Sequence, residues 1–192
     1  FNVMRKEERT HILAFPIKEG SEYPSFPVRG RLRLSEDAAD FFKDEDTGVS
    51  ASNRLRGIVL HDILSQVSTA SDLTKAVDYA LMSGELNADE ARTAFGLLSG
   101  ALKSVEDRGW FADDVQLMYN EASLIDTDGE IYRPDRVTVR GGKVVIVDYK
   151  FGEHQRKYEK QVRKYMDIWR RMGYEDVSGF LWYVDALTVV EV

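Results

Sequence analysis

The chain has 192 residues, a hydrophobic fraction of 43% and a formal net charge of −7, which suits one globular domain with an ample core. It contains no cysteine, which excludes disulfide bonds and thiolate metal sites. The longest apolar run, Phe180 to Val184, is too short to span a membrane. Because the first residue is Phe1 and no signal peptide is visible, we expect a fragment of a longer polypeptide in an intracellular, cytoplasmic setting.

The charge is unevenly distributed along the chain. Residues 150–172 hold eight Lys and Arg against three Asp and Glu, so this segment carries +5 and the remainder carries −12. A local basic surface, rather than the total charge, sets the affinity for a polyanion. The acidic remainder suits docking to another domain or simple solubility, so charge alone does not decide the class of partner.

The first half of the chain predicts an extended segment followed by helices. Residues 1–28 contain three prolines, and we interpret them as a lead-in or inter-domain linker. Apolar residues at helical spacing follow. The predicted helices cover Glu36–Lys43, Ser52–Val67, Ser71–Met82 and Ala88–Arg108. The last of them begins with Asn87 and Glu90, the spacing of a capping box.

The second half is rich in predicted strands. These cover Val115–Tyr119, Ala122–Asp126, an alternating segment 131–139, the segment that starts at Val144, Val177–Val184 and a short one near Leu187–Val190. An Asp128-Gly129 turn and a Gly141-Gly142 turn reverse the chain. The unbroken apolar run from Val144 to Val147 is typical of a strand buried on both faces. One amphipathic helix is predicted over Glu153–Met172.

Two carboxylates and a lysine are expected at the end of this buried strand. Alternation puts Asp148 and Lys150 on one face and Tyr149 on the other. Asp135, thirteen residues before Asp148, is far enough away to return beside it across the hairpin. Such oxygen ligands suit Mg²⁺ or Mn²⁺, and a nearby lysine suits a phosphate or a metal-bound water. The simpler interpretation is a hairpin whose polar ends are merely solvated.

Three further features are weak in isolation. His61 lies near the edge of the apolar stripe of its helix, where a lone histidine is usually structural. Glu121, ahead of a strand, would alone be an ordinary solvated glutamate. Gln161 and Tyr165 share a helix face because they are four residues apart, and by themselves they fit a surface glutamine beside a core tyrosine.

In combination these motifs resemble the RecB-like nucleases of the PD-(D/E)XK superfamily, including those at the C terminus of UvrD/REP-type helicases such as AddA. The matching positions are Gly57 with His61, Glu121, Arg133-Pro134-Asp135, Asp148-Tyr149-Lys150, and Gln161 with Tyr165. Their joint order and spacing are specific, and the resemblance covers roughly residues 35–185.

The resemblance implies an α/β, restriction-endonuclease-like three-layer fold, in which helices flank a mixed central sheet after an N-terminal helical portion. The nuclease domain would cover residues 29–192, with a helical insertion over about 71–108. The implied activity is Mg²⁺- or Mn²⁺-dependent hydrolysis of DNA phosphodiester bonds, by an exonuclease of a helicase–nuclease in DNA repair or recombination. The substrate would be single-stranded DNA or duplex ends delivered by helicase motor domains.

The resemblance also implies a role for each motif residue. The metal would be held by His61, Asp135, Asp148 and the backbone carbonyl of Tyr149. Lys150 would orient the attacking water or stabilise the transition state, and Gln161 and Tyr165 would position the DNA strand or the lysine. Glu121 would support these ligands or bind a second metal ion.

The charged face of the last helix is expected to follow a phosphate backbone. Its members are Arg156, Lys157, Lys160, Arg163 and Lys164. The alternative is a catalytically inactive DNA-docking or protein-interaction domain of a helicase. Such domains usually lose the aspartates or the lysine, and all of these are present here.

Overall fold

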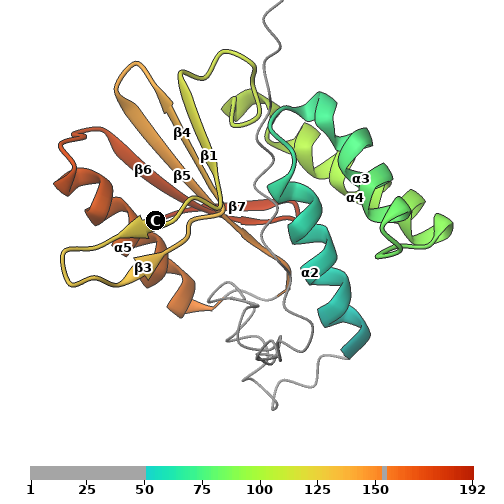
Figure 1. Ribbon diagram of the computed structural model, residues 1–192. Coiled ribbons are helices and arrows are strands. Elements are labelled where there is room, and N and C mark those ends of the chain that lie inside the picture. The colour runs from blue at the N-terminus through green and yellow to red at the C-terminus, as the bar shows by residue number, and fades with distance from the viewer. Residues whose placement is uncertain (1–50, 153–154) are drawn as a thin grey trace, which may run out of the picture. The chain divides into compact units, whose positions relative to one another are not determined.

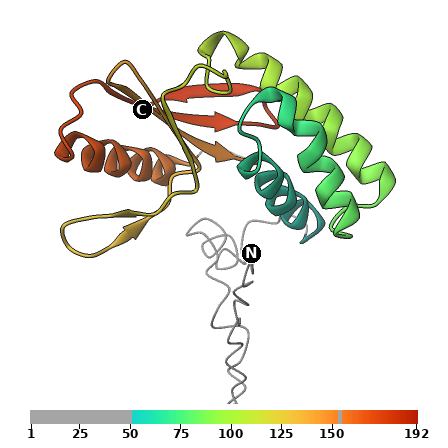
Figure 2. The ribbon, with the colours of Figure 1, turned by 45° about the horizontal axis from the view of Figure 1, so that its top comes forward.

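The computed structural model describes residues 51–152 and 155–192, and within them the chain forms three layers (Figures 1 and 2). Across these residues one five-stranded sheet has the order β1 (Leu117–Asn120), β4 (Arg136–Arg140), β5 (Lys143–Lys150), β6 (Val177–Tyr183) and β7 (Thr188–Glu191). β5 and β6 are parallel, and the other neighbours are antiparallel. One face is covered by α5 (Arg156–Arg171) and the other by helices that precede the sheet. The predicted mixed sheet flanked by helices is therefore confirmed.

The helical layer follows the predicted periodicity. It contains α2 (Ala51–Ser65), the 3₁₀ turn η2 (Ala70–Asp72), α3 (Leu73–Met82), α4 (Ala88–Ser104) and the 3₁₀ turn η3 (Glu106–Arg108). The predicted capping box begins α4, since the Asn87 side chain accepts from the backbone of Asp89 and Glu90, and the Glu90 side chain accepts from the backbone of Asn87. The prediction of one helix to Arg108 is wrong, because the chain leaves α4 at Val105 and tightens into η3 before Gly109, whose φ is 66°.

The β4–β5 hairpin forms as expected. Gly141 and Gly142 have φ values of 58° and 84°, the left-handed conformation that a two-residue hairpin turn needs at both positions. The register pairs Val139 with Val144 and Arg136 with Val147. β5 lies in the middle of the sheet and is buried along most of its length, which explains its continuous apolar sequence.

The prediction of one strand over 131–139 is wrong. Pro134 lacks an amide proton and restricts the residue before it, so the ladder breaks ahead of β4. The residues that precede Pro134 form β3 (Ile131–Tyr132), which pairs with β2 (Leu124–Ile125) in a separate two-stranded sheet. The strand predicted over Ala122–Asp126 is thus shorter and lies outside the main sheet. The turn at Gly129, with a φ of 81°, is where it was expected.

Alternation along β5 divides the interior into two cores. Val144 and Ile146 pack in the core beneath α5, whereas Val147 and Tyr149 pack in the core beneath α2, α3 and α4. α5 approaches the sheet at Gly179 of β6, where a Cβ atom would lie only 2.5 Å from side-chain atoms of Val162 and Met166. The sheet therefore has helices packed closely on both faces.

Some expectations fall outside the described residues. These are the lead-in over residues 1–28, the helix Glu36–Lys43 and the first residues of the helix predicted from Glu153. Of the helices in 51–152 and 155–192, none has both the length and the apolar character that a membrane crossing requires.

Candidate active site

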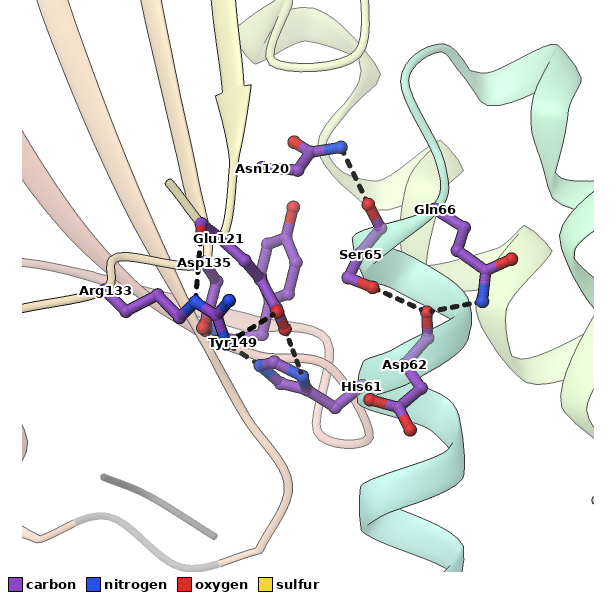
Figure 3. A network of polar contacts seen from close by, with 9 residues as sticks. All are labelled: His61, Asp62, Ser65, Gln66, Asn120, Glu121, Arg133, Asp135 and Tyr149. Atoms are coloured by element: carbon purple, nitrogen blue, oxygen red, sulfur yellow. Dashed lines mark hydrogen bonds and ion pairs between the residues drawn. The ribbon is translucent and has the colours of Figure 1, made fainter. Parts of the chain in front are cut away.

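α2 brings His61 to the end of the sheet where β5 finishes (Figure 3). The His61 Nε2 atom lies 2.9 Å from Asp135 Oδ1, and Nδ1 lies 3.5 Å from Glu121 Oε1. Glu121 directly follows β1 and Asp135 directly precedes β4, so three distant parts of the sequence meet here. Burial disfavours protonation of His61, but Asp135, Glu121 and Asp148 outweigh it and raise the pKa of His61 to about 9.

Asp135 is fixed from two sides. The backbone N–H of Tyr149 donates to Asp135 Oδ2 at 2.5 Å, while His61 contacts Oδ1. Burial disfavours ionisation of this carboxyl group, but His61, Lys150 and the Tyr149 amide together lower the pKa of Asp135. The hairpin thus returns an ionised Asp135 to the end of β5.

Asp148 and Lys150 lie on the face of β5 that α5 covers. The Lys150 Nζ atom is 2.7 Å from Asp148 Oδ2, and both side chains are buried. The ammonium group is also 4.5 Å from the centre of the Tyr158 ring. Tyr149 points to the opposite face, where its ring meets Trp182 edge-on. Asp148 raises the pKa of His61, and Lys150 lowers that of Asp135. The Asp148–Lys150 pair is therefore electrostatically coupled to the cluster around His61.

Gln161 and Tyr165 form a pair on α5. The Gln161 amide donates from Nε2 to Tyr165 Oη at 2.8 Å. The buried Tyr165 ring meets Tyr132 of β3 edge-on at 6.1 Å between ring centres. The pair therefore connects α5 to the small β2–β3 sheet.

Gly57 lies one turn before His61 and faces Phe151, just beyond β5. A Cβ atom added at Gly57 would lie 3.6 Å from the Phe151 Cβ atom, which is an ordinary contact distance. The described packing thus places α2 beside the end of β5 without requiring a glycine at this position.

Sequence reasoning missed Asp62. Ligand atoms of His61, Asp62 and Glu121 lie within 4.8 Å of one another, so these residues could hold a cation. His61 is one of the predicted metal ligands, and Glu121 was predicted to support them or to bind a second metal ion, so Asp62 is the addition. An imidazole nitrogen and carboxylate oxygens are donors that suit Mn²⁺ or Mg²⁺, so the residues present fit such an ion. The acidic residue next to His61 was visible in the sequence, but neighbours in a helix normally point in different directions.

The arginine of the Arg133-Pro134-Asp135 motif has a contact that the motif did not predict. Arg133 donates from Nε to the backbone carbonyl of Glu121 at 2.8 Å, and its NH1 group lies 3.5 Å from Glu121 Oε2. Glu121 has a φ of 49°, a left-handed conformation that is uncommon for a residue other than glycine. Arg133 therefore supports a strained residue that contacts His61.

The basic face of α5 is mostly exposed, as expected, with one exception. Lys164 lies 2.6 Å from the buried carboxylate of Asp126, which Arg171 also contacts at 2.7 Å. These two ion pairs lower the pKa of Asp126 and fasten the β2–β3 sheet to α5. Lys164 is therefore partly used inside the fold, whereas four basic side chains remain exposed. They are Arg156, Lys157, Lys160 and Arg163.

The comparison with known families fits this geometry. No curated protein matches the chain. Residues 26–191, most of the chain, match the family model of the PD-(D/E)XK nuclease superfamily. The order of the layers is consistent with the restriction-endonuclease-like fold of that superfamily. The chain therefore belongs to the PD-(D/E)XK nuclease superfamily.

Proposed function

We propose that the chain is a RecB-like deoxyribonuclease domain, an exonuclease that hydrolyses DNA phosphodiester bonds with Mg²⁺ or Mn²⁺. The single observation that supports this best is the convergence of His61, Asp135 and Glu121 at the sheet end that also carries the Asp148–Lys150 pair. Membership of a nuclease superfamily that uses divalent metals makes a chemical role for this group more plausible than a solvated hairpin end.

The metal would be held by His61, Asp135, Asp148 and the backbone carbonyl of Tyr149, with Glu121 and the newly found Asp62 beside them. A bound divalent cation supplies a Lewis acid next to the scissile phosphate. His61 must give up its proton to offer a lone pair to the metal. Asp135 and Glu121 would then be available to ligate the metal instead of neutralising a charged imidazole.

Lys150 and the α5 pair complete the proposed chemistry. The Lys150 ammonium group lies 2.7 Å from Asp148 and can donate to a nucleophilic water or to a phosphate oxygen. Gln161 would position the DNA strand or the lysine, with Tyr165 as its partner. The exposed cations of α5 would contact the backbone of single-stranded DNA or of a duplex end.

The wider setting is part of the same proposal. The domain over residues 29–192, with its insertion at about 71–108, would act in the bacterial cytoplasm on DNA supplied by helicase motor domains in the same polypeptide or complex. DNA repair or recombination is the process in which such an arrangement works. The second candidate, an inactive docking domain of a helicase, is less consistent with the complete set of charged residues at the site.

The test is cleavage of labelled linear single-stranded DNA with Mn²⁺, with Mg²⁺ or with EDTA. The Asp148→Ala variant is assayed beside Asp89→Ala, which removes an exposed aspartate of α4. We expect cleavage that needs metal, is lost in Asp148→Ala and is retained in Asp89→Ala. Equal cleavage by Asp148→Ala and the unmodified chain would refute the site. Absence of both cleavage and metal binding would favour the docking domain.

A further inference from the structure

Arg136, the residue after Asp135, is a fully buried cation that donates hydrogen bonds both to the chain that follows α2 and, from Nε at 2.9 Å, to the carbonyl of Trp110. Its side chain is 0% exposed. NH1 donates to the carbonyl of Val67 at 2.9 Å, and NH2 donates to that of Ser68 at 2.6 Å. The guanidinium group also lies 4.0 Å from the centre of the Phe111 ring. A buried charge needs such partners because it has lost its hydration.

Asn120, the cross-strand partner of Arg136, binds the same segment. Its Nδ2 group donates to the carbonyl of Ser65 at 2.9 Å, while its Oδ1 atom accepts from Arg136 NH1 at 3.1 Å. Ser65 is the last residue of α2. The final carbonyls of a helix have no partner within the helix. Asn120 satisfies one of them, and Arg136 satisfies the carbonyls of Val67 and Ser68 in the segment that follows the helix. We call Asn120 and Arg136 the carbonyl clamp.

The residues next to the carbonyl clamp are the ones that contact His61. Glu121 follows Asn120, Asp135 precedes Arg136, and the Glu121 amide donates to the Asp135 carbonyl at 3.0 Å. His61 lies one helical turn before Ser65 on α2. The carbonyl clamp thus holds the end of α2 and the segment after it, and the residues beside the clamp, Glu121 and Asp135, hold the imidazole one turn away. Figure 3 shows Asn120 at the end of α2, with Glu121 and Asp135 beside His61.

We propose that Asn120 and Arg136 are positioning residues: they fasten the end of α2 to the sheet and so determine where His61 lies between Asp135 and Glu121. The inference rests on the proposed function, because the measured consequence is metal affinity. Partners that orient metal ligands commonly change the affinity for metal about 10- to 100-fold when they are removed. A clamp with a purely structural role would instead change stability alone.

The experiment is a double-mutant cycle read by the affinity for Mn²⁺ in isothermal titration calorimetry. Arg136→Lys and Asn120→Ala are each made in the natural chain and in His61→Gln. We expect each clamp variant to weaken Mn²⁺ binding at least about tenfold in the natural chain and to add no further loss in His61→Gln. The control is Val105→Ala, a buried position just after α4 and outside the clamp, which should leave Mn²⁺ affinity unchanged.

The outcomes are distinct. Unchanged Mn²⁺ affinity in the clamp variants, or an equal loss in both backgrounds, overturns the positioning role and leaves the proposed metal site intact. If His61→Gln itself binds Mn²⁺ like the natural chain, the proposed role of His61 fails, and the positioning inference fails with it. If Arg136→Lys does not fold, Asn120→Ala tests the proposal alone. The Asn120 side chain is only partly buried, and its removal breaks fewer hydrogen bonds than a change at Arg136.

Discussion

His61 carries its proton between two carboxylates, and this makes the charge of the site depend on pH. Without metal, the imidazolium ion offsets the negative charges of Asp135 and Glu121. A neutral imidazole would leave two carboxylates close together with less compensation. The same side chain therefore stabilises the metal-free protein as a cation and would bind metal only as a neutral ligand.

The unfolding free energy of the metal-free protein should depend on pH through His61. The pKa rises from 6.5 in the unfolded chain to about 9 in the folded protein. The stabilisation is therefore fully present below pH 6.5 and is lost as the pH rises to about 9. We compare the free energy of unfolding of the natural chain with that of His61→Gln. The advantage of the natural chain should be larger at pH 6 than at pH 9.5 by on the order of 3 kcal/mol. Urea unfolding in EDTA measures this, and a pH-independent difference would contradict it.

Lys150 is expected to serve cleavage rather than DNA binding. It is buried against Asp148, so it has little surface to offer to a phosphate backbone. Lys150→Ala should lower the cleavage rate at saturating DNA at least about 100-fold, the loss typical of a group that stabilises developing charge. DNA affinity should change little.

The matched control is Lys160→Ala, which removes an exposed lysine of α5. We expect the reverse result there, with weaker binding and a retained rate at saturation. Single-turnover cleavage and fluorescence anisotropy with Ca²⁺ in place of Mg²⁺ separate the two quantities. If the two variants behaved alike, the distinction between a chemical and a binding lysine would be wrong.

At the scale of elements, α5 packs tightly against β6 at Gly179. Gly179→Ala would put a Cβ atom 2.5 Å from Val162 Cγ1 and Met166 Sδ, both in a buried core. Because one of these atoms belongs to a stiff β-branched side chain, we expect a loss of about 1–3 kcal/mol in the free energy of unfolding. Chemical denaturation measures it.

Gly100→Ala is the control for this substitution. Gly100 lies inside α4 with no atom near the added Cβ position, so alanine should be neutral or raise stability by up to about 1 kcal/mol. A stable Gly179→Ala variant would mean that α5 can move away from the sheet at little cost.

Elements that bury a regular stripe could be predicted from the sequence, and elements that depend on distant contacts could not. Helical spacing predicted α2 and α5, and the apolar run predicted β5. Alternation continues through 131–139, so it could not show that Pro134 separates β3 from β4. The division into two sheets depends on pairing with β2, which local periodicity does not contain.

The same limit applies to the site. Period-two alternation was enough to place Asp148 and Lys150 together, because both lie on one strand. The contact between His61 and Asp135 depends on how α2 is held, partly by an Arg136–Val67 hydrogen bond between residues 69 positions apart. Only the family resemblance linked His61 to Asp135 before the structure did.

At the scale of the whole molecule, an acidic chain must bind a polyanion through a small basic area. The net charge is −7, yet α5 exposes several cations on the layer of the fold opposite α2, α3 and α4. Repulsion from the acidic remainder should weaken non-specific binding and make the contacts along α5 the main source of affinity. A few basic residues of α5 should therefore account for most of the salt dependence of DNA binding.

The double variant Lys160→Ala/Arg163→Ala should make the negative slope of log affinity against log salt concentration shallower by about 1.4 for single-stranded DNA. Each lost phosphate contact accounts for about 0.7 of this change. The control pair, Lys75→Ala with Lys103→Ala, removes exposed lysines from α3 and α4 and should leave the slope unchanged. Anisotropy titrations from about 50 to 200 mM salt measure both. An equal fall in both pairs would mean that DNA responds to the total charge, and a fall in the control pair alone would place the strand on the helical layer.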